Sequence, residues 1–377
     1  MASTNTRAPL TRLLTSGIDL MAQMPYVSEL LKRVVPSFSL SMIRVDARCA
    51  PQQHYSEYFD DFSHDLFASS GHLFAAAGDD PAAFGRLLRA PVPYGNLVRG
   101  GAGYESGATY QHLFQRNGIH HCLDVALRDG SGPLGILGIF REKKAPAFTR
   151  SDVAMVAELY PALVHALCAE PLPSPHEASD EAILIANEDG VVEWASEPGR
   201  AWLEDAIGCS GRTQLHDNRL PEAVRVLARR LQRGEVPAMT LPVPGGQLQL
   251  RAYALSALNA GETSSRVAIK VALEMNRRLK IIRALDTAPL TERLRLVALG
   301  HADGKTPIQI REELGITRAT LKSYQKDLYS RLDVSSSAEL VELLNTQAAS
   351  VTFDLGRHLP RGPKTRVPPT AVGGSRA

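Results

Sequence analysis

The most regular pattern of hydrophobic and polar positions runs from residue 290 to residue 344, near the C-terminus. Thr306, followed by a proline and then by Gln309, predicts a capping box at the start of a short helix. Gly315 predicts the end of that helix, because glycine adopts the left-handed C-cap conformation without steric cost. Thr317 predicts the cap of a longer second helix. Two helices joined by a tight turn that contains glycine form a helix-turn-helix.

The predicted second helix has two contrasting faces. One face carries the large apolar side chains of Leu321, Tyr324, Leu328 and Leu332. The opposite face carries the small and basic side chains of Ala319, Lys322, Ser323, Lys326 and Ser330. Two lysines among small side chains make a slim cationic surface that fits a DNA major groove. A solvated helix face is the alternative interpretation, since most charged helix faces serve only that purpose.

Two further helices are predicted on either side of this pair. Ser336 and Glu339 have capping-box spacing, which predicts a helix start after residue 336. Residues 274–286 predict a connecting helix, with apolar residues at helical spacing at Met275, Leu279, Ile282 and Leu285. The apolar side of that connecting helix is a candidate dimer contact.

Upstream, apolar residues change between a period of two, typical of strands, and a helical period. Residues 1–9 predict an unstructured start, residues 10–35 helices interrupted at Pro25, and residues 51–90 a mostly helical segment. The predicted strands are 38–45, 120–128 and 134–141, with a turn at 129–132 and an amphipathic helix opened by Thr149 and Asp152.

A proline-rich segment, residues 171–180, predicts a linker to a second α+β region. A hairpin is predicted from residues 182–186 and 191–194, followed by helices around Trp202 and at 221–233 and by strands at 238–243, 247–256 and 265–273. Trp194 and Trp202 are both expected in the core.

A chain of 377 residues with 44% hydrophobic and 22% charged residues has room for two or three ordinary globular domains. The N-terminus has no signal-peptide pattern, and the longest strongly apolar run, residues 134–140, is too short to span a bilayer. The cysteines have no paired spacing, which favours reduced thiols in a cytosolic protein: Cys49, Cys122, Cys168 and Cys209.

The net charge of +2 conceals a local basic character near the C-terminal pattern. One group of basic residues precedes it, at Arg277, Arg278, Lys280 and Arg283. A second group follows it in a segment rich in proline and glycine, at Arg357, Arg361, Lys364, Arg366 and Arg376. This distribution favours a polyanionic partner at that end of the chain.

Other candidate chemistry is weaker. The glycine-rich residues 95–107 lack the strand and helix register of a phosphate-binding loop, and a loop beside a pocket is the better interpretation. The histidines, including His120 and His121, have no zinc-site spacing, so structural histidines are favoured over a metal or haem site. Cys122 beside His121 is the only candidate nucleophile and base, but neighbours on a strand point to opposite faces. The sequence therefore predicts no enzyme and no cofactor.

The C-terminal pattern resembles the LuxR-type (also FixJ- or NarL-type) DNA-binding domain of bacterial transcription regulators. The resemblance rests on Leu290-Thr291, Ile310, Leu314-Gly315-Ile316-Thr317, Thr320-Leu321-Lys322, Leu328-Tyr329, Leu332, Val334-Ser335-Ser336 and Ala338-Glu339. It implies that Lys322, Ser323 and Lys326 face base edges. It also implies that Thr306, Thr317 and Thr320 contact phosphates, with Arg318 among the DNA contacts.

Two residues depart from that family pattern. Leu294 stands where a glutamate usually completes a capping box with Thr291, which should weaken the first helix by about 1 kcal/mol. Arg311 stands where alanine is preferred, so its stem must extend outward or the helix crossing must open. These departures leave an alternative open, a protein-interaction regulator whose helix-turn-helix does not read DNA specifically.

The upstream regions resemble two sensory families. Residues 134–141, Phe148-Thr149 and Asp152 resemble the end of a GAF-type domain, which implies an antiparallel sheet that encloses a small-molecule pocket. The hairpin at 182–194 and the element order after it resemble a PAS-type domain, with Ser196 in place of a frequent asparagine.

The sequence thus predicts α+β sensory regions followed by an all-α, four-helix helix-turn-helix domain. The expected boundaries are a GAF-like domain at 1–170, a PAS-like domain at 181–273, a connecting helix at 274–286, a reader at 287–347 and a disordered basic tail at 348–377. The predicted function is a cytoplasmic, homodimeric transcription regulator that responds to a small ligand of unknown identity. Its expected partners are double-stranded DNA and RNA polymerase, and no membrane.

Overall fold

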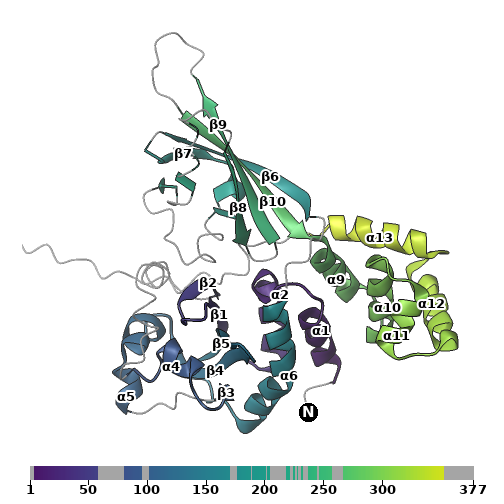
Figure 1. The fold of residues 1–377 in the computed structure, drawn as a ribbon, viewed down its shortest axis with the longest axis horizontal. Helices are drawn as coiled ribbons and strands as arrows, with labels where there is room; N and C mark the ends of the chain where they lie inside the picture. The colour runs from purple at the N-terminus through teal and green to yellow at the C-terminus, as the bar shows by residue number, and fades with distance from the viewer. Residues whose placement is uncertain are drawn as a thin grey trace, which may run out of the picture.

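The computed structural model describes residues 4–57, 80–95, 102–169, 176–187, 189–200, 202–203, 218–220, 224–225, 227, 231, 237–243, 246–256 and 266–351. Three domains follow one another along this part of the chain, two built on antiparallel sheets and the last one helical (Figure 1). The predicted fold class is confirmed.

The first domain is a five-stranded antiparallel sheet in the order β2-β1-β5-β4-β3. Its strands are β1 (Ser39–Val45), β2 (Pro51–Ser56), β3 (Tyr94–Gly95), β4 (Ile119–Asp129) and β5 (Gly132–Glu142). Helices α1 (Thr4–Leu14), α2 (Leu20–Val34) and α6 (Arg150–Cys168) cover one face, which carries Leu40, Leu123 and Leu137. The opposite face carries Cys122, Ala126 and Phe140, and α4 (Phe84–Leu88), α5 (Ala102–Glu105) and the π-helix Tyr110–Phe114 lie against it. Two separate cores therefore flank this sheet.

The second domain repeats the strand order of the first, as β7-β6-β10-β9-β8. Its strands are β6 (His176–Asn187), β7 (Val192–Ala195), β8 (Ala238–Val243), β9 (Gly246–Leu255) and β10 (Arg266–Asn276). One face buries Leu184, Leu250 and Ile269 with Trp202 and Leu203. On the other face, the alternate residues of 181–187 and 249–255 that point outward are all exposed or half-buried.

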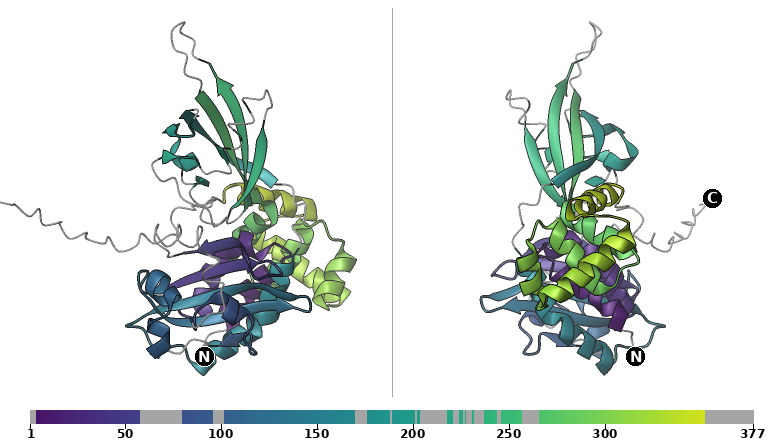
Figure 2. Two further views of the ribbon diagram at one scale, coloured as in Figure 1. Left: turned by 60° about the vertical axis from the view of Figure 1, so that its left-hand side comes forward. Right: turned by 90° about the vertical axis from the view of Figure 1, so that its right-hand side faces the viewer.

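The helical domain begins without a linker. Asn276 is the last residue of β10 and also the N-cap of the next helix, where its side chain accepts a hydrogen bond from the Leu279 N–H. The helices are α9 (Arg277–Thr287), α10 (Glu292–Ala302), α11 (Pro307–Leu314), α12 (Arg318–Leu332) and α13 (Ser337–Ala349). They lie beside α1 and α2 at the base of the second sheet in all three views (Figures 1 and 2).

Most predicted elements of the sheets are confirmed within a few residues, but the N-terminal part of the prediction is wrong in three places. The helix α1 starts at Thr4, inside the segment predicted to be unstructured. Pro25 lies inside α2 and does not interrupt it; the break falls before Asp19, whose side chain caps α2, and Gly17 adopts a positive φ of 75° there. Residues 51–56 form β2 instead of a helix, because they pair with β1. The predicted helical residues 58–79 lie outside the described residues.

Three further boundaries differ from the prediction. β6 starts at His176, inside the predicted linker, because its first residues pair with the end of β10. Trp194 is exposed and not in the core, since β7 is an edge strand and places this residue on the uncovered face. The helix α13 continues to Ala349, two residues beyond the predicted end of the reader, and the rest of the predicted tail lies outside the described residues.

One described helix, α6, has the length and apolar composition to cross a membrane. In this fold it packs on β4 and β5 and against α1 and α2. A core helix of a soluble protein can meet the same criterion, so this helix alone is weak evidence for a membrane span.

Candidate nucleic-acid interface

Local capping fixes the geometry of the helix-turn-helix as the sequence predicts. The Thr306 hydroxyl accepts a hydrogen bond from the Gln309 N–H at 3.3 Å, and the Gln309 side chain accepts one from the Thr306 N–H at 2.8 Å. Gly315 ends α11 with a φ of 61°, in the left-handed region. Thr317 then caps α12 by accepting a hydrogen bond from the Thr320 N–H at 3.1 Å. The predicted box at Ser336 is only half right, because the Glu339 carboxylate returns to the N–H of Ser335.

The two departures from the family pattern have clear places in the fold. Thr291 makes no side-chain cap hydrogen bond, as expected, but Leu294 is buried in the domain core. The close approach of α10 and α11 occurs at Gly300, where a Cβ atom would lie 2.8 Å from Ile310 Cγ1. Arg311 points away from this crossing and lies 3.7 Å from the Glu312 carboxylate, so it does not open the helix pair.

The two predicted faces of α12 are present in the structure. Leu321 and Leu328 are buried, and Tyr324 and Leu332 are half-buried against the core. Lys322, Ser323 and Lys326, which are predicted to read bases, are exposed, and so are Ala319 and Ser330 on the same face. The structure therefore leaves this helix face free of contact with the described parts of both sheet domains.

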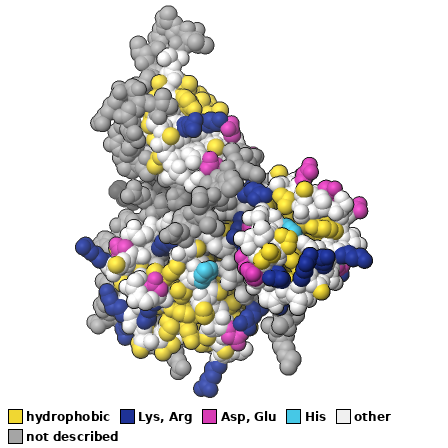
Figure 3. Space-filling model, turned by 45° about the vertical axis from the view of Figure 1, so that its right-hand side comes forward, with side chains coloured by type: hydrophobic (Ala, Val, Ile, Leu, Met, Phe, Trp, Pro, Cys, Tyr) yellow, Lys and Arg dark blue, Asp and Glu magenta, His cyan; other side chains and the backbone are white. Residues whose placement is uncertain are grey.

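The exposed face of α12 carries uncompensated positive charge. Within the described residues, Arg318, Lys322 and Lys326 form no ion pair, whereas the acid on the same helix, Asp327, pairs with Arg331 at 2.7 Å. A row of basic side chains crosses the helical domain in Figure 3. Such a surface attracts phosphates, and no ion pair within the described residues has to break before these side chains bind them.

The predicted phosphate contacts surround the starts of α11 and α12. Thr306 and Thr317 are exposed N-cap residues, and Thr320 lies in the first turn of α12. The hydroxyls of Thr317 and Thr320 are 2.8 Å apart and share a hydrogen bond. Backbone N–H groups at a helix start favour an anion, so these positions suit a DNA phosphate.

A contact between α10 and α12 that the sequence did not reveal helps to position α12. His301 at the end of α10 is buried, and its Nε2 lies 3.1 Å from Gln325 Nε2 on α12. Burial lowers the pKa of His301, so the neutral ring can accept the hydrogen bond that the Gln325 amide donates. This contact fixes the rotation of α12 relative to α10, and its two residues gave no signal in the sequence.

The basic group that precedes the reader is used inside the protein, which corrects its assignment to a polyanionic partner. Lys280 is 1% exposed. Arg277 donates a hydrogen bond to Asn345 at 3.1 Å, Arg278 pairs with Asp303 at 2.8 Å, and Arg283 lies over the Tyr26 ring at 4.8 Å. The apolar side of α9 is likewise buried in this chain, so it is not available as the predicted dimer contact.

A charged junction joins the first domain to the reader. Arg12 on α1 forms ion pairs with Asp286 at the end of α9 and with Glu292 at the start of α10, the latter at 3.0 Å. Tyr26 on α2 donates its hydroxyl to the same Asp286, and burial raises the pKa of Tyr26, so it remains a neutral donor. The Arg12 side chain is only 2% exposed. The position of the reader is thus fixed by side chains of the first domain.

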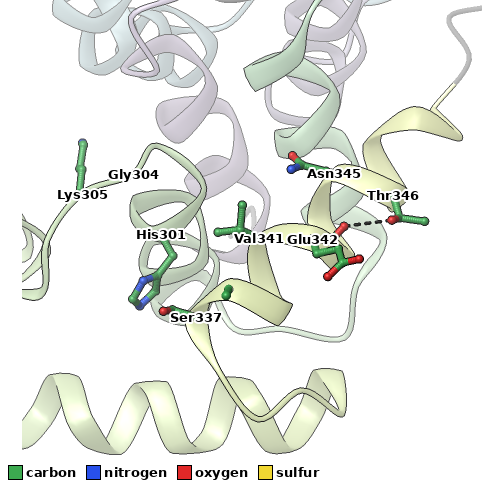
Figure 4. A pocket seen from close by; sticks show the side chains of 9 residues that line it. His301, Gly304, Lys305, Ser337, Val341, Glu342, Asn345 and Thr346 are labelled. Carbon is green, nitrogen blue, oxygen red and sulfur yellow. Dashed lines mark hydrogen bonds between the residues drawn. The ribbon is translucent and has the colours of Figure 1, made fainter.

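An open groove of about 610 Å³ lies between the end of α10 and the outer side of α13 (Figure 4). His301, Lys305 and Glu342 are among its lining residues. Figure 4 also shows the hydrogen bond from the Thr346 hydroxyl to the Glu342 carbonyl, at 3.0 Å. None of the residues predicted to contact DNA lines this groove.

The other candidate residues of the first domain, His120, His121 and Cys122, lie on β4. A β-bulge between Ile119 and His121 breaks the strand alternation, and the rings of His120 and His121 lie against each other at 4.8 Å. Cys122 is buried, its Sγ lies 3.2 Å from the Tyr104 hydroxyl, and burial raises the pKa of this thiol. Part of the glycine-rich segment, residues 96–101, lies outside the described residues.

Comparison with known proteins assigns the helical domain. Residues 288–344 match the family described as "Bacterial regulatory proteins, luxR family". No curated protein matches the chain. The helical domain is therefore a LuxR-family helix-turn-helix domain, as its sequence indicates.

Several solved structures show partial similarity. The sensor region of a sensor histidine kinase is 15% identical over 40% of this chain and 63% of its own, with a TM-score of 0.19. The Vibrio cholera VqmA–ligand–DNA complex is 16% identical over 48% of this chain and 86% of its own, with a TM-score of 0.23. The periplasmic sensory domain of the Campylobacter jejuni chemoreceptor Tlp1 is 10% identical over 70% and 86%, with a TM-score of 0.17. At these TM-scores the similarities carry no argument about this chain.

Proposed function

We propose that this chain, whose residues 288–344 form a LuxR-family helix-turn-helix domain, is a transcription regulator that binds specific double-stranded DNA through α12. The observation that carries the proposal is the outward face of α12, which is slim, exposed and free of ion pairs at Arg318, Lys322 and Lys326. Lys322, Ser323 and Lys326 would read base edges, and Thr306, Thr317 and Thr320 would anchor phosphates.

The test is selection of DNA fragments from a random pool by the purified full chain. We expect the wild type to enrich a short sequence, and the Lys322→Ala/Lys326→Ala double variant to enrich none. The matched control is Lys143→Ala/Lys144→Ala, which removes two exposed lysines from the turn after β5. Enrichment of the same sequence by wild type and reader variant would refute the proposed site, and no enrichment by any of the three would refute specific reading.

The alternative of a degenerate reader receives no support from the residues that suggested it. Leu294 contributes to the core of the domain, and Arg311 extends away from the helix crossing. Both departures leave the Thr317 cap of α12 and the exposed face of α12 intact. Specific DNA binding is therefore the better proposal.

The proposal includes a homodimer, and the uncovered face of the second sheet supports it. Four residues that are paired across neighbouring strands form a row on that face: Trp194, Ile185, Ala268 and Tyr253. Trp194 is 56% exposed and Tyr253 is 42% exposed, unusual values for large aromatic residues. Figure 3 shows hydrophobic side chains on this upper domain, with basic and acidic side chains among them.

A second copy of the chain fits this face. A two-fold axis parallel to the strands, between β6 and β10, would place Trp194 against Tyr253 of the second copy and Ile185 against Ala268 of the second copy. Charges of both signs flank the row, with Arg266 paired to Glu193 at 2.6 Å and Lys270 paired to Glu181 at 2.7 Å, so two copies meet without a like-charge surface. The face measures about 19 Å by 30 Å, or about 570 Å², so residues around its edge must add to the contact for each partner to bury the roughly 800 Å² of a standard interface.

The two sheet domains would act as sensors that respond to a small ligand and act on the reader through the Arg12 junction. We propose that they are not catalytic, because the candidate nucleophile Cys122 is buried with a raised thiol pKa. The proposed place of action is the cytoplasm, where the DNA and RNA polymerase are found. Contact with RNA polymerase belongs to the proposal as the expected route from DNA binding to transcription.

A further inference from the structure

A row of small and polar residues crosses the first sheet from edge to edge. The paired register joins Ser56, Ser41, Gly138, Asp124 and Gly95, one residue from each strand. Residues paired in this way share a face of the sheet. Their neighbours Cys122, Ala126 and Phe140 belong to the second core, so the row faces α4, α5 and the π-helix.

The centre of this row is a buried carboxyl group with an unused oxygen. Asp124 is 4% exposed, and its Oδ2 has no hydrogen-bond partner among the described residues. Burial raises the pKa of this carboxyl to about 7. The Ser39 and Ser56 hydroxyls on the same face are also buried without a partner. Buried polar atoms without partners are rare in proteins, and each requires an explanation.

The two cross-strand neighbours of Asp124 leave room on one side only. At Gly138 a Cβ atom would lie 2.5 Å from Cζ of Phe140, so the Phe140 ring already covers that position. At Gly95, which is itself buried, a Cβ atom would meet no atom of the described residues within 4 Å. Within the part of the chain that the structure describes, the space beside the carboxyl on the side of β3 is therefore unfilled.

Four aromatic residues belong to the core on this face of the sheet, Tyr104, Tyr110, Phe114 and Phe140. The ring centroids of Phe114 and Phe140 are 5.5 Å apart, and those of Tyr104 and Tyr110 are 4.8 Å apart. The Tyr104 hydroxyl contacts the Sγ of Cys122, two residues from Asp124 on the same side of β4. Aromatic faces and a carboxylate both attract cations, and together they distinguish an ammonium group from a neutral group of the same shape.

We propose that Asp124 binds the protonated amine of a small organic ligand seated in the space beside Gly95, against the aromatic cluster of Tyr104, Tyr110, Phe114 and Phe140. The ligand class is a small primary amine with an apolar body. This inference rests on the proposed ligand-responsive function and supplies the chemistry of the ligand that the function leaves open.

Binding should be linked to proton release. Without ligand, Asp124 is mostly protonated at pH 6 and mostly ionised at pH 8, because its pKa is about 7. An ammonium group requires the ionised carboxylate, so its affinity should fall by about tenfold from pH 8 to pH 6. The other described titratable groups around this face include Cys122 and Tyr104, whose pKa values burial raises, Tyr110, whose pKa is also raised, His54, and His120 and Glu105 beside Tyr110. His54 lies on β2, three strands or about 14 Å from β4.

The experiment is isothermal titration of the full chain with ethylamine, butylamine, benzylamine and phenethylamine, and with the corresponding alcohols. We expect at least one amine to bind with one site per chain and its alcohol to bind at least tenfold more weakly. Asp124→Asn should reduce the affinity for that amine at least tenfold. Ser56→Ala, which removes another unpartnered polar group from the same row, should leave it unchanged.

Titration of the wild type at pH 6 in buffers of different ionisation enthalpy adds a measurement that requires no variant to fold. We expect release of close to one proton per bound amine at pH 6 and almost none at pH 8. The proposal is overturned if no amine of the series binds, if amines and alcohols bind equally, or if binding releases no proton at pH 6. None of these titrations contains DNA, so the site and the proposed DNA-binding function fail independently.

Discussion

Arg12 and Asp286, 274 positions apart in the chain, form an ion pair that joins the first helix of the protein to the helix that precedes the reader. Arg12 also bonds both carboxylate oxygens of Glu292 at 3.0 Å. Burial raises the pKa of Glu292, and the positive charges of Arg12 and Arg295 oppose this increase. One guanidinium group therefore compensates two partly buried acids at the boundary between sensor and reader.

We predict that Arg12→Ala destabilises the full chain by about 3 kcal/mol, because Asp286 and Glu292 would lose their buried counter-charge. Chemical denaturation at pH 7 measures the change. The matched control is Arg33→Ala, which breaks the exposed pair with Glu29 and should cost below about 1 kcal/mol. Equal effects of the two variants would show that the Arg12 junction is no stronger than a surface ion pair.

The two reading lysines should differ from a phosphate contact in their salt dependence. We predict that Lys322→Ala or Lys326→Ala lowers affinity for the selected DNA site by about 1–3 kcal/mol and relaxes its preference at one base pair. Binding isotherms at several salt concentrations, on the selected site and on scrambled DNA, measure both effects. An equal loss on both DNAs, with a smaller salt slope, would assign the lysine to a phosphate.

The Asp124 carboxyl should make the stability of the first domain depend on pH. Its pKa is raised from 3.8 to about 7, so the folded state holds a proton that the unfolded state has already lost between these values. Stability is therefore greatest at low pH for this group and decreases as the pH rises to about 7, by about 4 kcal/mol in total. We predict that Asp124→Asn gains stability over the wild type from pH 5 to pH 8.

Thermal unfolding of both proteins without ligand, at pH 5, 6, 7 and 8, tests this. The difference in midpoint temperature between Asp124→Asn and the wild type should grow with pH and level off above pH 7. Ser56→Ala serves as the control, since it changes a buried group that carries no charge. A difference that is constant across the range would mean that Asp124 keeps an ordinary pKa.

The uncovered sheet face makes a prediction about assembly. Trp194→Glu should place a charge against Tyr253 of the second copy in the proposed contact and shift the protein from dimer to monomer in sedimentation velocity at micromolar concentration. Val92→Glu changes another exposed apolar residue, on the first domain, and should leave the dimer intact. A wild type that sediments as a monomer, or a Trp194→Glu variant that remains a dimer, would exclude this face as the interface.

The parts of the fold that the sequence predicts well are those that depend on near neighbours. The caps at Thr306 and Thr317 connect residues three positions apart, so the motif alone contains the information. The exposure of Trp194 depends on which face of the second sheet is covered, which no local pattern shows. The partners of Arg277 and Arg278 come from helices later in the chain, and a basic group that looks available for DNA is thereby used internally.

The candidate sites divide in the same way. The lysines of α12 could be assigned because helical spacing determines their face, and the structure confirms that face as exposed. The row through Asp124 requires the register of five strands, two of which were misassigned or not predicted, so no periodicity in one strand shows it. The contact of His301 with Gln325 likewise exists only once α10 and α12 are packed.

Asn276 closes the last strand of the second sheet and opens α9 without an intervening residue. No flexible linker therefore separates β10 from α9, and we expect the two elements to move together. A reader domain joined to its sensor by a flexible linker would have no defined orientation relative to it. We therefore expect a tilt of β10 to turn α9 with it, so that a signal from this sheet reaches the reader as a change of orientation.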